Sequence, residues 1–323
     1  MATDLAVGLD PGTASPSRRK GRRGLAWQFA RRVRRDPIAV TAAAIVIVVL
    51  VAAVAATSLR YSYAEQDLRH RSEQPSRNHL LGTDQLGRDV LARLAYGARV
   101  SLIVASAATT ITLVIGVTVG ATAGYAGGRI DAVLMRFVDA MYAFPDLLFV
   151  ILVGSLIRGK VDEGADGLLR PVASLDHATN GLFPVFLALG LTSWLTTSRL
   201  VRAQMLALKT TEYVQASKGS GATGTHIIRR HLLPNTIAPL IVAGTLAIPN
   251  AILLEAGLSF IGLGVQPPMP SWGIMLSDGV ASLRSFPHLM LFPAIAIGLT
   301  LLALNVLGDA LRDAVDPLLQ HTR

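Results

Sequence analysis

Residues 37–59 read PIAVTAAAIVIVVLVAAVAATSL, an apolar run without a single charged side chain. A helix needs about 20 such residues to cross the hydrocarbon core of a bilayer, whereas the apolar core of a signal peptide has about 7 to 15. The run therefore predicts an uncleaved membrane span. The alternative is a signal peptide cleaved near Ala53-Val54-Ala55, and the length of the run argues against it.

The composition of the whole chain also indicates a membrane protein. Of 323 residues, 51% are hydrophobic and only 16% are charged, which is unusual for a water-soluble protein. The formal net charge is +9, but nine of the 30 Lys and Arg residues lie within 18–35, directly before the apolar run. That position is typical of a cytoplasmic membrane flank, so we expect no nucleic-acid partner. Because the chain has no cysteine, disulfides and thiolate sites are excluded.

Six apolar segments predict an all-α fold with six transmembrane helices. They cover residues 37–59, 100–124, 137–157, 181–201, 236–262 and 288–308. With a cytoplasmic basic tail, six crossings place both termini in the cytoplasm of a multi-pass plasma-membrane protein. This orientation puts 19 Lys and Arg residues inside and 11 outside, as the positive-inside rule favours.

The expected organisation follows from these spans. The basic tail has no apolar periodicity and should be largely disordered up to Trp27. The successive parts are a tail 1–36, a first span 37–59, an extracytoplasmic segment 60–98, a five-span core 99–309 with a cytoplasmic segment 202–235, and a cytoplasmic end 310–323.

Small residues and prolines within the spans predict how the helices pack. Gly116, Gly120 and Gly124 recur every four residues, a spacing that lets a second helix approach closely. Pro239 and Pro249 interrupt the fifth span and free backbone carbonyls, which lipid cannot satisfy. We therefore expect the fifth span to be buried in a bundle.

Polar residues in the spans are candidates for a transport pathway. A continuous third helix places Asp146 roughly 16 Å from its outer end, near the bilayer centre. An ionisable side chain there costs about 2.5 to 3.5 kcal/mol and usually faces protein or water. We expect Asp146 to face the pathway, with Asn250 as a second candidate; alternatively, Asp146 only satisfies groups near a kink at Pro145. Glu255, roughly 28 Å beyond Thr236, should be hydrated near the outer interface.

Motifs for catalysis or cofactor binding lack their context. Residues 219–224 match GxGxxG but follow a helix-like stretch, and no GxxxxGK[ST] loop occurs. His226 and His231 are the only neighbouring histidines, and a spacing of five does not place both on one helical face. We expect no cofactor, metal or catalytic residue here. Arg199 and Arg202 should extend to the cytoplasmic surface.

The cytoplasmic segment carries the most specific pattern. Residues 212–221, EYVQASKGSG, followed by Leu233-Pro234, resemble the signature of ABC-importer permeases, in which Glu-Ala-Ala is followed by Gly and later by Ile-x-Leu-Pro. Here residues 215–217 read Gln-Ala-Ser, and His231 takes the Ile position. The alternative is an amphipathic loop lying on the membrane.

Four further boxes occur in the order of the dipeptide, oligopeptide and nickel permeases. The likeness is to the subunit type with an extra N-terminal span. The boxes are Leu81–Val90 (LGTDQLGRDV), Met135-Arg136 with Asp139 and Phe144-Pro145, Glu255–Gly273, and Gly308–Asp313 with Asp316-Pro317.

The resemblance implies a type I importer permease that forms half of a translocation pathway. Its expected partners are a second permease, two ATPase subunits that bind ATP and Mg, and an extracytoplasmic solute-binding protein. It also implies an ATPase-coupling element, a short helix-turn-helix over about 216–230 that Leu233-Pro234 ends before the fifth span. The candidate coupling residues are Ala216, Ser217, Gly221, Ala222, Thr223, Gly224, His226, Ile227, Leu233 and Pro234.

Two other functional classes stay open at this point. One is an intramembrane hydrolase or lipid transferase, which requires several converging polar residues at membrane depth. The other is a channel or an ion-driven transporter that works alone. The solute is also open, because dipeptides, longer peptides, nickel chelates and haem-like cargo all fit permeases of this group.

Overall fold

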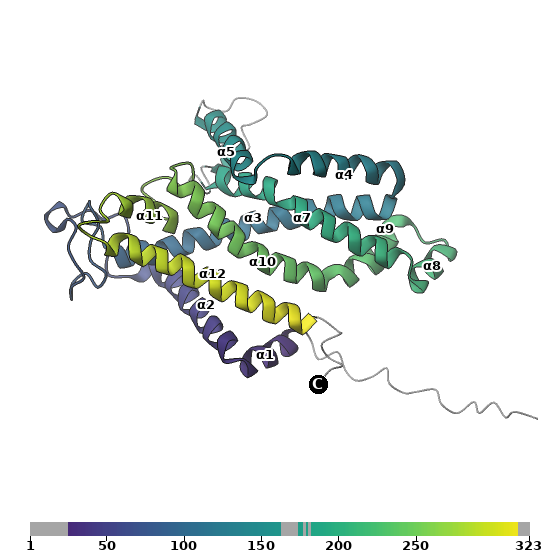
Figure 1. Ribbon diagram of the computed structural model, residues 1–323, viewed down its shortest axis with the longest axis horizontal. Helices are drawn as coiled ribbons and strands as arrows, with labels where there is room; N and C mark the ends of the chain where they lie inside the picture. Colours follow the sequence, from purple (N-terminus) through teal and green to yellow (C-terminus); the bar gives the residue numbers. More distant parts are fainter. Residues whose placement is uncertain (1–24, 163–173, 177–178, 180–181, 316–323) are drawn as a thin grey trace, which may run out of the picture.

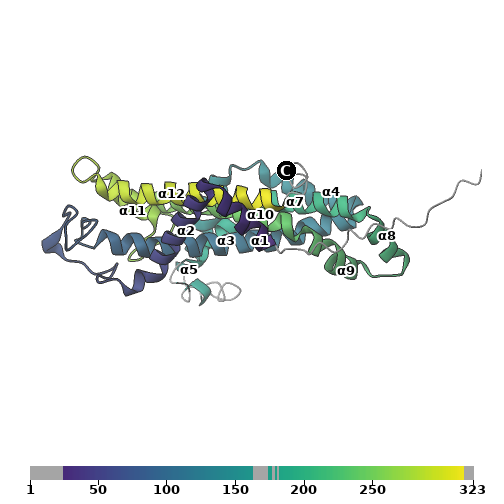
Figure 2. The ribbon, with the colours of Figure 1, turned by 90° about the horizontal axis from the view of Figure 1, so that it is seen from below.

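The computed structural model describes residues 25–162, 174–176, 179 and 182–315 (Figure 1). These residues form helices and connecting segments and contain no strand, so the all-α prediction is confirmed. Five long helices pack side by side in a flattened bundle (Figures 1 and 2). They are α2 (Pro37–Ala55), α3 (Val90–Ala126), α7 (Phe183–Lys209), α10 (Leu233–Phe260) and α12 (His288–Val315).

Shorter helices flank or cap this bundle. They are α1 (Leu25–Arg35), η1 (Ala56–Ser58), η2 (Leu68–His70), α4 (Gly128–Tyr142), α5 (Asp146–Asp162), α8 (Glu212–Gly219), α9 (Gly224–Ile227), the π-helix η4 (Ile228–Leu232) and α11 (Trp272–Val280).

Within the described residues, four helices are long and apolar enough to cross a membrane: 37–58, 90–126, 224–260 and 288–315. The pair α4 and α5 forms a fifth candidate, bent by 94° at its break. The 27-residue α7 is the remaining expected span, but it is too polar to count on the same criterion. The structure therefore supports a multi-pass protein with four or five clear spans.

The expected continuous helix over 137–157 is wrong. Helix α4 ends at Tyr142, and α5 starts at Asp146 in a new direction. Pro145 lies at the break; its ring disfavours a helical conformation at Phe144, and it has no N–H group to continue the ladder. The estimate that Asp146 lies near the bilayer centre assumed one straight helix, so it no longer holds.

Helix α7 runs parallel to α3 and packs directly on its glycine face. A Cβ atom at Gly116 would lie 2.6 Å from Thr197 Cβ, and one at Gly124 would lie 2.6 Å from Met205 Cβ. The close approach predicted from the four-residue spacing is thus confirmed. Since α3 and α7 run in the same direction, the chain between residues 127 and 182 must return to the end of the bundle where α3 began.

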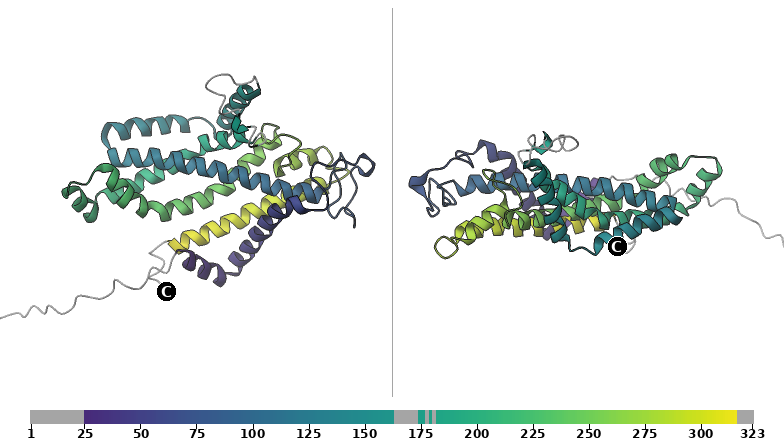
Figure 3. Two further views of the ribbon diagram at one scale, coloured as in Figure 1. Left: turned by 180° about the vertical axis from the view of Figure 1, so that it is seen from behind. Right: turned by 90° about the horizontal axis from the view of Figure 1, so that it is seen from above.

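Most of the tail that was expected to be disordered, residues 1–24, lies outside the described residues, and the first helix starts at Leu25, close to Trp27. Residues 25–35 form α1, which packs beside the end of α12 (Figure 3). An ion pair of 2.6 Å joins Arg32 of α1 to Asp313 of α12. Asp36 then accepts a hydrogen bond from the Ile38 amide at 2.9 Å and caps α2. This polar connection keeps the start of α2 and the end of α12 at the same end of the bundle.

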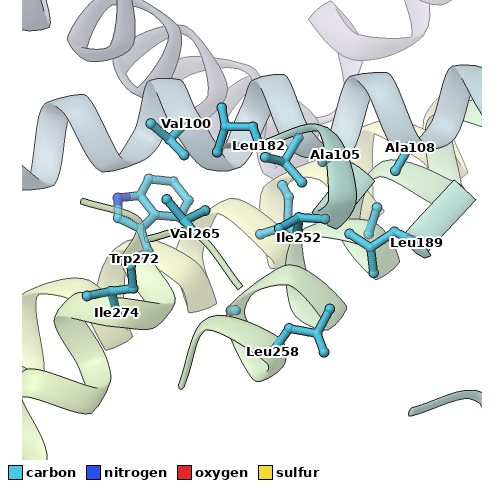
Figure 4. Close-up of a cluster of buried hydrophobic side chains, with 14 of the residues drawn as sticks. Val100, Ala105, Ala108, Leu182, Leu189, Ile252, Leu258, Val265, Trp272 and Ile274 are labelled. Carbon is cyan, nitrogen blue, oxygen red and sulfur yellow. The ribbon is translucent and has the colours of Figure 1, made fainter. Parts of the chain in front are cut away.

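The largest apolar core lies between α3, α7, α10 and α11 (Figure 4). Its fully or almost fully buried side chains include Trp272, Leu189, Ile252 and Val104. The indole nitrogen of Trp272 donates to the Leu94 carbonyl at 3.0 Å, which ties α11 to the start of α3. We call this end of the bundle, with residues 79–101 and 255–278, the α11 end.

A buried charge network fixes the α11 end. The Asp84 carboxylate accepts from the Arg88 side chain at 2.7 Å, from Arg93, and from the amides of Leu86 and Arg88. Arg93 also reaches Asp278 at 3.2 Å. Asp89 caps α3 by accepting from the Ala92 amide at 2.8 Å. Much of the 81–90 box therefore builds the turn into α3.

Glu255 is fully buried, so the expectation that it is hydrated is wrong. Its carboxylate accepts hydrogen bonds from Ser101 of α3 at 2.8 Å and from Ser259 one turn further along α10 at 2.6 Å. Residues 261–271 and α11 fold back over this end of α10. Serine hydroxyl groups therefore supply the hydrogen bonds to Glu255 that water was expected to supply.

Candidate functional site

A cavity of about 600 Å³ lies between α3, the break from α4 to α5, α7 and α10. Both candidate pathway residues line it: Asp146 from the first turn of α5 and Asn250 from α10, directly after Pro249. Residues far apart in the sequence are thus brought to one site. The 94° break gives Asp146 this position, because it turns the start of α5 toward α7 and α10.

Hydroxyl groups make up most of the other polar lining. Thr109 and Thr112 come from α3, while Thr192 comes from α7. Thr112 donates to the Gly190 carbonyl at 3.4 Å, and Thr192 donates to its own helix. Thr109 is 6% exposed, and its hydroxyl has no hydrogen-bond partner among the described residues. Besides the Asp146 carboxylate, the cavity therefore offers neutral hydrogen-bonding groups among apolar side chains.

One edge of the cavity is closed by an aromatic side chain at the end of α4. Tyr142 shares a 2.6 Å hydrogen bond with the Thr196 hydroxyl of α7. The Arg199 guanidinium lies 4.1 Å from the ring centroid of Tyr142 and donates to Asp139 at 2.5 Å. These contacts hold the end of α4 against α7.

Arg199 and Arg202, expected to extend to the cytoplasmic surface, are both paired with carboxylates of α4. Arg199 is paired as above, and Arg202 makes two hydrogen bonds of 2.5 and 2.7 Å to Asp131 of α4. A planar guanidinium matches a carboxylate in this bidentate geometry. Both carboxylate partners belong to α4, and no sequence pattern predicted that α4 folds back along α7.

At the opposite end of the bundle, which we call the α8 end, residues 212–232 form a compact element that we call the coupling segment. Helix α8 is followed by a turn at residues 220–223 and by α9, as the predicted helix-turn-helix requires. Gly221 lies in this turn with φ +80°, a conformation that strains other residues. Thr223 caps α9 by accepting from the His226 amide at 3.4 Å.

The inner face of the coupling segment is apolar. Val214, Ile227 and Leu232 are fully buried and pack with Val201 and Met205 of α7. Ile227 is thus an internal anchor, although it was proposed as a coupling residue.

Tyr125, near the end of α3, is a second anchor for the coupling segment. A Cβ atom at Gly224 would lie 2.9 Å from its ring. Lys209 donates to its carbonyl at 2.5 Å. Gly224 therefore contacts the protein's own α3, and the segment is attached to both α3 and α7.

The outer edge of the coupling segment is polar and open. Thr223, Thr225, His226, Arg229 and Arg230 are exposed and line a shallow groove of about 700 Å³. A Cβ atom at Gly221 would meet no atom within 4 Å, so this turn also faces open space. This edge therefore presents exposed hydrogen-bond donors and two positively charged arginines to a partner.

The π-helix η4 explains why two expectations for this segment are wrong. The first was that His226 and His231 lie on different faces, and the second was that the helix ends at Leu233-Pro234. The five-residue turn of η4 places the rings of His226 and His231 5.9 Å apart, so a spacing of five does share a face here. The Leu233 amide donates to the Ile228 carbonyl, and Pro234, which has no N–H group, follows directly. The helical path therefore continues into α10 instead of ending at Leu233-Pro234.

The remaining candidate residues divide between the two faces. Ala216 and Pro234 are exposed, whereas Ser217, Ala222 and Leu233 are half-buried. Within the described residues, no group of three or more His, Cys, Asp or Glu side chains could hold a metal ion. Sequence reasoning missed Tyr125, Tyr142 and Thr109, because only the fold brings them to these sites.

Comparisons with known proteins match most of the chain. Residues 116–321 match the family described as binding-protein-dependent transport system inner membrane component, and residues 24–75 match the N-terminal TM domain of oligopeptide transport permease C. The chain is 42% identical over 298 residues to the dipeptide transport system permease protein DppC of Bacillus subtilis, covering 92% of this chain and 86% of that protein.

Oligopeptide transport system permease proteins are similar over comparable lengths. OppC of Bacillus subtilis is 38% identical over 296 residues, covering 91% of this chain and 90% of that protein. OppC of Haemophilus influenzae is 38% identical over 295 residues, covering 90% and 88%. The similarity therefore extends over both the cavity and the coupling segment.

Proposed function

This chain belongs to the family of binding-protein-dependent transport system inner membrane components, and we propose that it forms half of the pathway of a peptide importer. A second permease subunit supplies the other half. The relatives are named as dipeptide and oligopeptide permeases, and dipeptides or short peptides are the solutes we assign to this chain.

The main support for this proposal is that α7 connects the cavity to the coupling segment. Thr192 and Thr196 of α7 line the cavity, and Val201 and Met205, further along the same helix, are buried against the coupling segment. A helix is stiff over this distance, so a push on the segment displaces one wall of the cavity. Helix α10 makes a similar link, because it continues from η4 and carries Asn250.

The energy source lies outside this chain. No GxxxxGK[ST] sequence is present, so the chain has no phosphate-binding loop of that kind. We assign ATP and Mg to two partner ATPase subunits, and we assign docking of one of them to the exposed edge at Gly221 and residues 223–230. An extracytoplasmic solute-binding protein delivers the peptide at the α11 end.

Copurification tests the assignment to an importer. Tagged chain extracted from membranes should be recovered with ATPase subunits and a second permease, and peptide uptake by the reconstituted complex should require ATP. If the isolated chain alone supported uptake, it would be a channel or an independent transporter. A hydrolytic activity of the isolated chain would favour an intramembrane enzyme.

The orientation is tested on the cysteine-free chain. Both Ser76 and Ser220 are exposed; Ser76 lies in the segment that leads into the α11 end, and Ser220 lies in the coupling segment at the α8 end. In intact cells, an impermeant thiol reagent should label the Ser76→Cys variant and leave Ser220→Cys unlabelled until the membrane is opened. The reverse pattern would place the coupling segment outside the cell and exclude contact with cytoplasmic ATPases.

A further inference from the structure

The cavity contains one charged side chain that none of the described residues neutralises. Its lining includes the Asp146 carboxylate but no lysine or arginine. Asp146 is exposed and makes no hydrogen bond or ion pair with the described residues. The first turn of α5 stabilises its negative charge through the helix dipole.

The neighbouring arginines form ion pairs with carboxylates other than Asp146. Arg199 is paired with Asp139 and stacked on Tyr142, and Arg202 is held by Asp131. Neither lines the cavity. A solute in the cavity therefore meets a net negative field, since each guanidinium charge is offset by its own carboxylate.

Two unpaired neutral groups accompany the carboxylate. Asn250 is exposed in the cavity wall, with no hydrogen bond to the described residues, and its amide can both donate and accept. The buried Thr109 hydroxyl also lacks a partner. An unsatisfied buried hydroxyl is uncommon, and beside an exposed carboxylate and an exposed amide that also lack partners among the described residues it indicates a place where a polar ligand completes the hydrogen bonds.

We infer that this cavity transiently binds the ammonium group of the passing solute, with Asp146 as its counter-charge and Asn250 as a hydrogen-bonding neighbour. This inference rests on the proposed function and specifies its solute chemistry. A carboxylate without a cation favours a positive group and disfavours a negative one. A zwitterionic peptide therefore passes this half of the pathway with its amino end toward α5.

A charge-selective labelling experiment tests the inference without relying on the binding protein. Ser193 is exposed and lines the same cavity, so Ser193→Cys gives a single reporter thiol. The complete importer in open membrane fragments is treated with cationic methanethiosulfonate-ethyltrimethylammonium or with anionic methanethiosulfonate-ethylsulfonate. The measured quantity is the ratio of the two rate constants.

Asp146→Asn should lower this cation-to-anion ratio at least about threefold, because one unit charge is removed at short range. Asp146→Glu, which keeps the charge, should restore it. The ratio at a control thiol, Ser76→Cys, should be unaffected. An unchanged ratio at Ser193→Cys in the Asp146→Asn background overturns the ammonium site. No labelling by either reagent at Ser193→Cys would show that the cavity is closed to water and would contradict the pathway itself.

Uptake identifies which ammonium group is bound. Dialanine carries only an N-terminal ammonium, whereas N-acetylalanyl-lysine carries only a side-chain ammonium. If Asp146→Asn slows dialanine alone severalfold, the site binds the peptide terminus; if it slows both, the site accepts any primary ammonium. Equal rates for the native and Asp146→Asn importers with both solutes would overturn the inference and leave the importer assignment intact.

Discussion

The two ends of the bundle are built in opposite ways. At the α11 end, charged side chains are buried and paired: Asp84 holds two arginines, and Glu255 accepts from serines of different elements. At the α8 end, the coupling segment buries only apolar anchors such as Ile227 and exposes its polar groups. The first arrangement fixes geometry, and the second leaves a surface free for another protein.

This contrast shows that a sequence box does not reveal the role of its residues. The 81–90 box and the coupling segment are both rich in glycine and polar residues. In the former, Asp84 and Asp89 are buried and stabilise a turn and a helix start. In the latter, Thr225 and Arg229 are exposed. Burial, which only the fold provides, separates the structural from the interacting residues.

The largest expected effect is at the α11 end. Replacing Asp84 by alanine leaves Arg88 and Arg93 buried without their main counter-charge, which should lower the free energy of unfolding by about 3 to 5 kcal/mol. Thermal or denaturant unfolding of the purified complex measures the change. Asp278 binds the same arginines but is 46% exposed, so Asp278→Ala should cost less than about 1 kcal/mol. Equal losses in the two variants would contradict the buried network.

A smaller effect should appear where the coupling segment meets α3. A side chain at Gly224 meets the Tyr125 ring, so Gly224→Leu should destabilise the segment by about 1 to 3 kcal/mol. Hydrogen exchange of residues 212–232 measures this local loss. Gly219, with no atom within 4 Å of its Cβ position, is the matched control, and Gly219→Leu should leave the exchange unchanged. Similar exchange in the two variants would show that Tyr125 is not an anchor.

The smallest effect is expected on the exposed surface near the α11 end. A 2.8 Å hydrogen bond to Asp67 raises the pKa of His70, helped by the Asp67 charge. The protonated form is therefore favoured by folding, and this contribution is present below the ordinary histidine pKa and is lost as pH rises through the raised value. The melting temperature of the native chain should exceed that of His70→Gln more at about pH 5.5 than at about pH 8.5. A difference independent of pH would contradict the pairing.

Much of the fold could be predicted from the sequence, because the signals are local. The apolar runs gave the long helices, and the spacing of Gly116, Gly120 and Gly124 gave the packing of a second helix. A kink at Pro145 was considered, but the sharp break there was missed because a membrane-length apolar run outweighed one proline in the prediction. The π-helix beside Pro234 was missed because it has no reliable local signal.

The candidate sites were predictable only in part. Asp146 and Asn250 were chosen one at a time as polar residues in apolar spans, and the structure brings both to one cavity. Ile227 was assigned to the partner surface because sequence position does not show which side of a short helix is buried. Tyr125 and Thr109 carried no signal, since an aromatic or threonine residue in a span is ordinarily part of the core.

The central claim is that the exposed turn at Gly221 transmits the work of an ATPase to the cavity. Its most direct test is the number of peptides imported per ATP hydrolysed by the reconstituted importer carrying Gly221→Leu. Gly221→Asn is the control, because asparagine tolerates positive φ and adds less bulk. The account predicts that Gly221→Leu loses the ATPase or imports at least about tenfold fewer peptides per ATP, while Gly221→Asn stays near the native ratio. A Gly221→Leu importer that assembles and imports at the native ratio would contradict the claim.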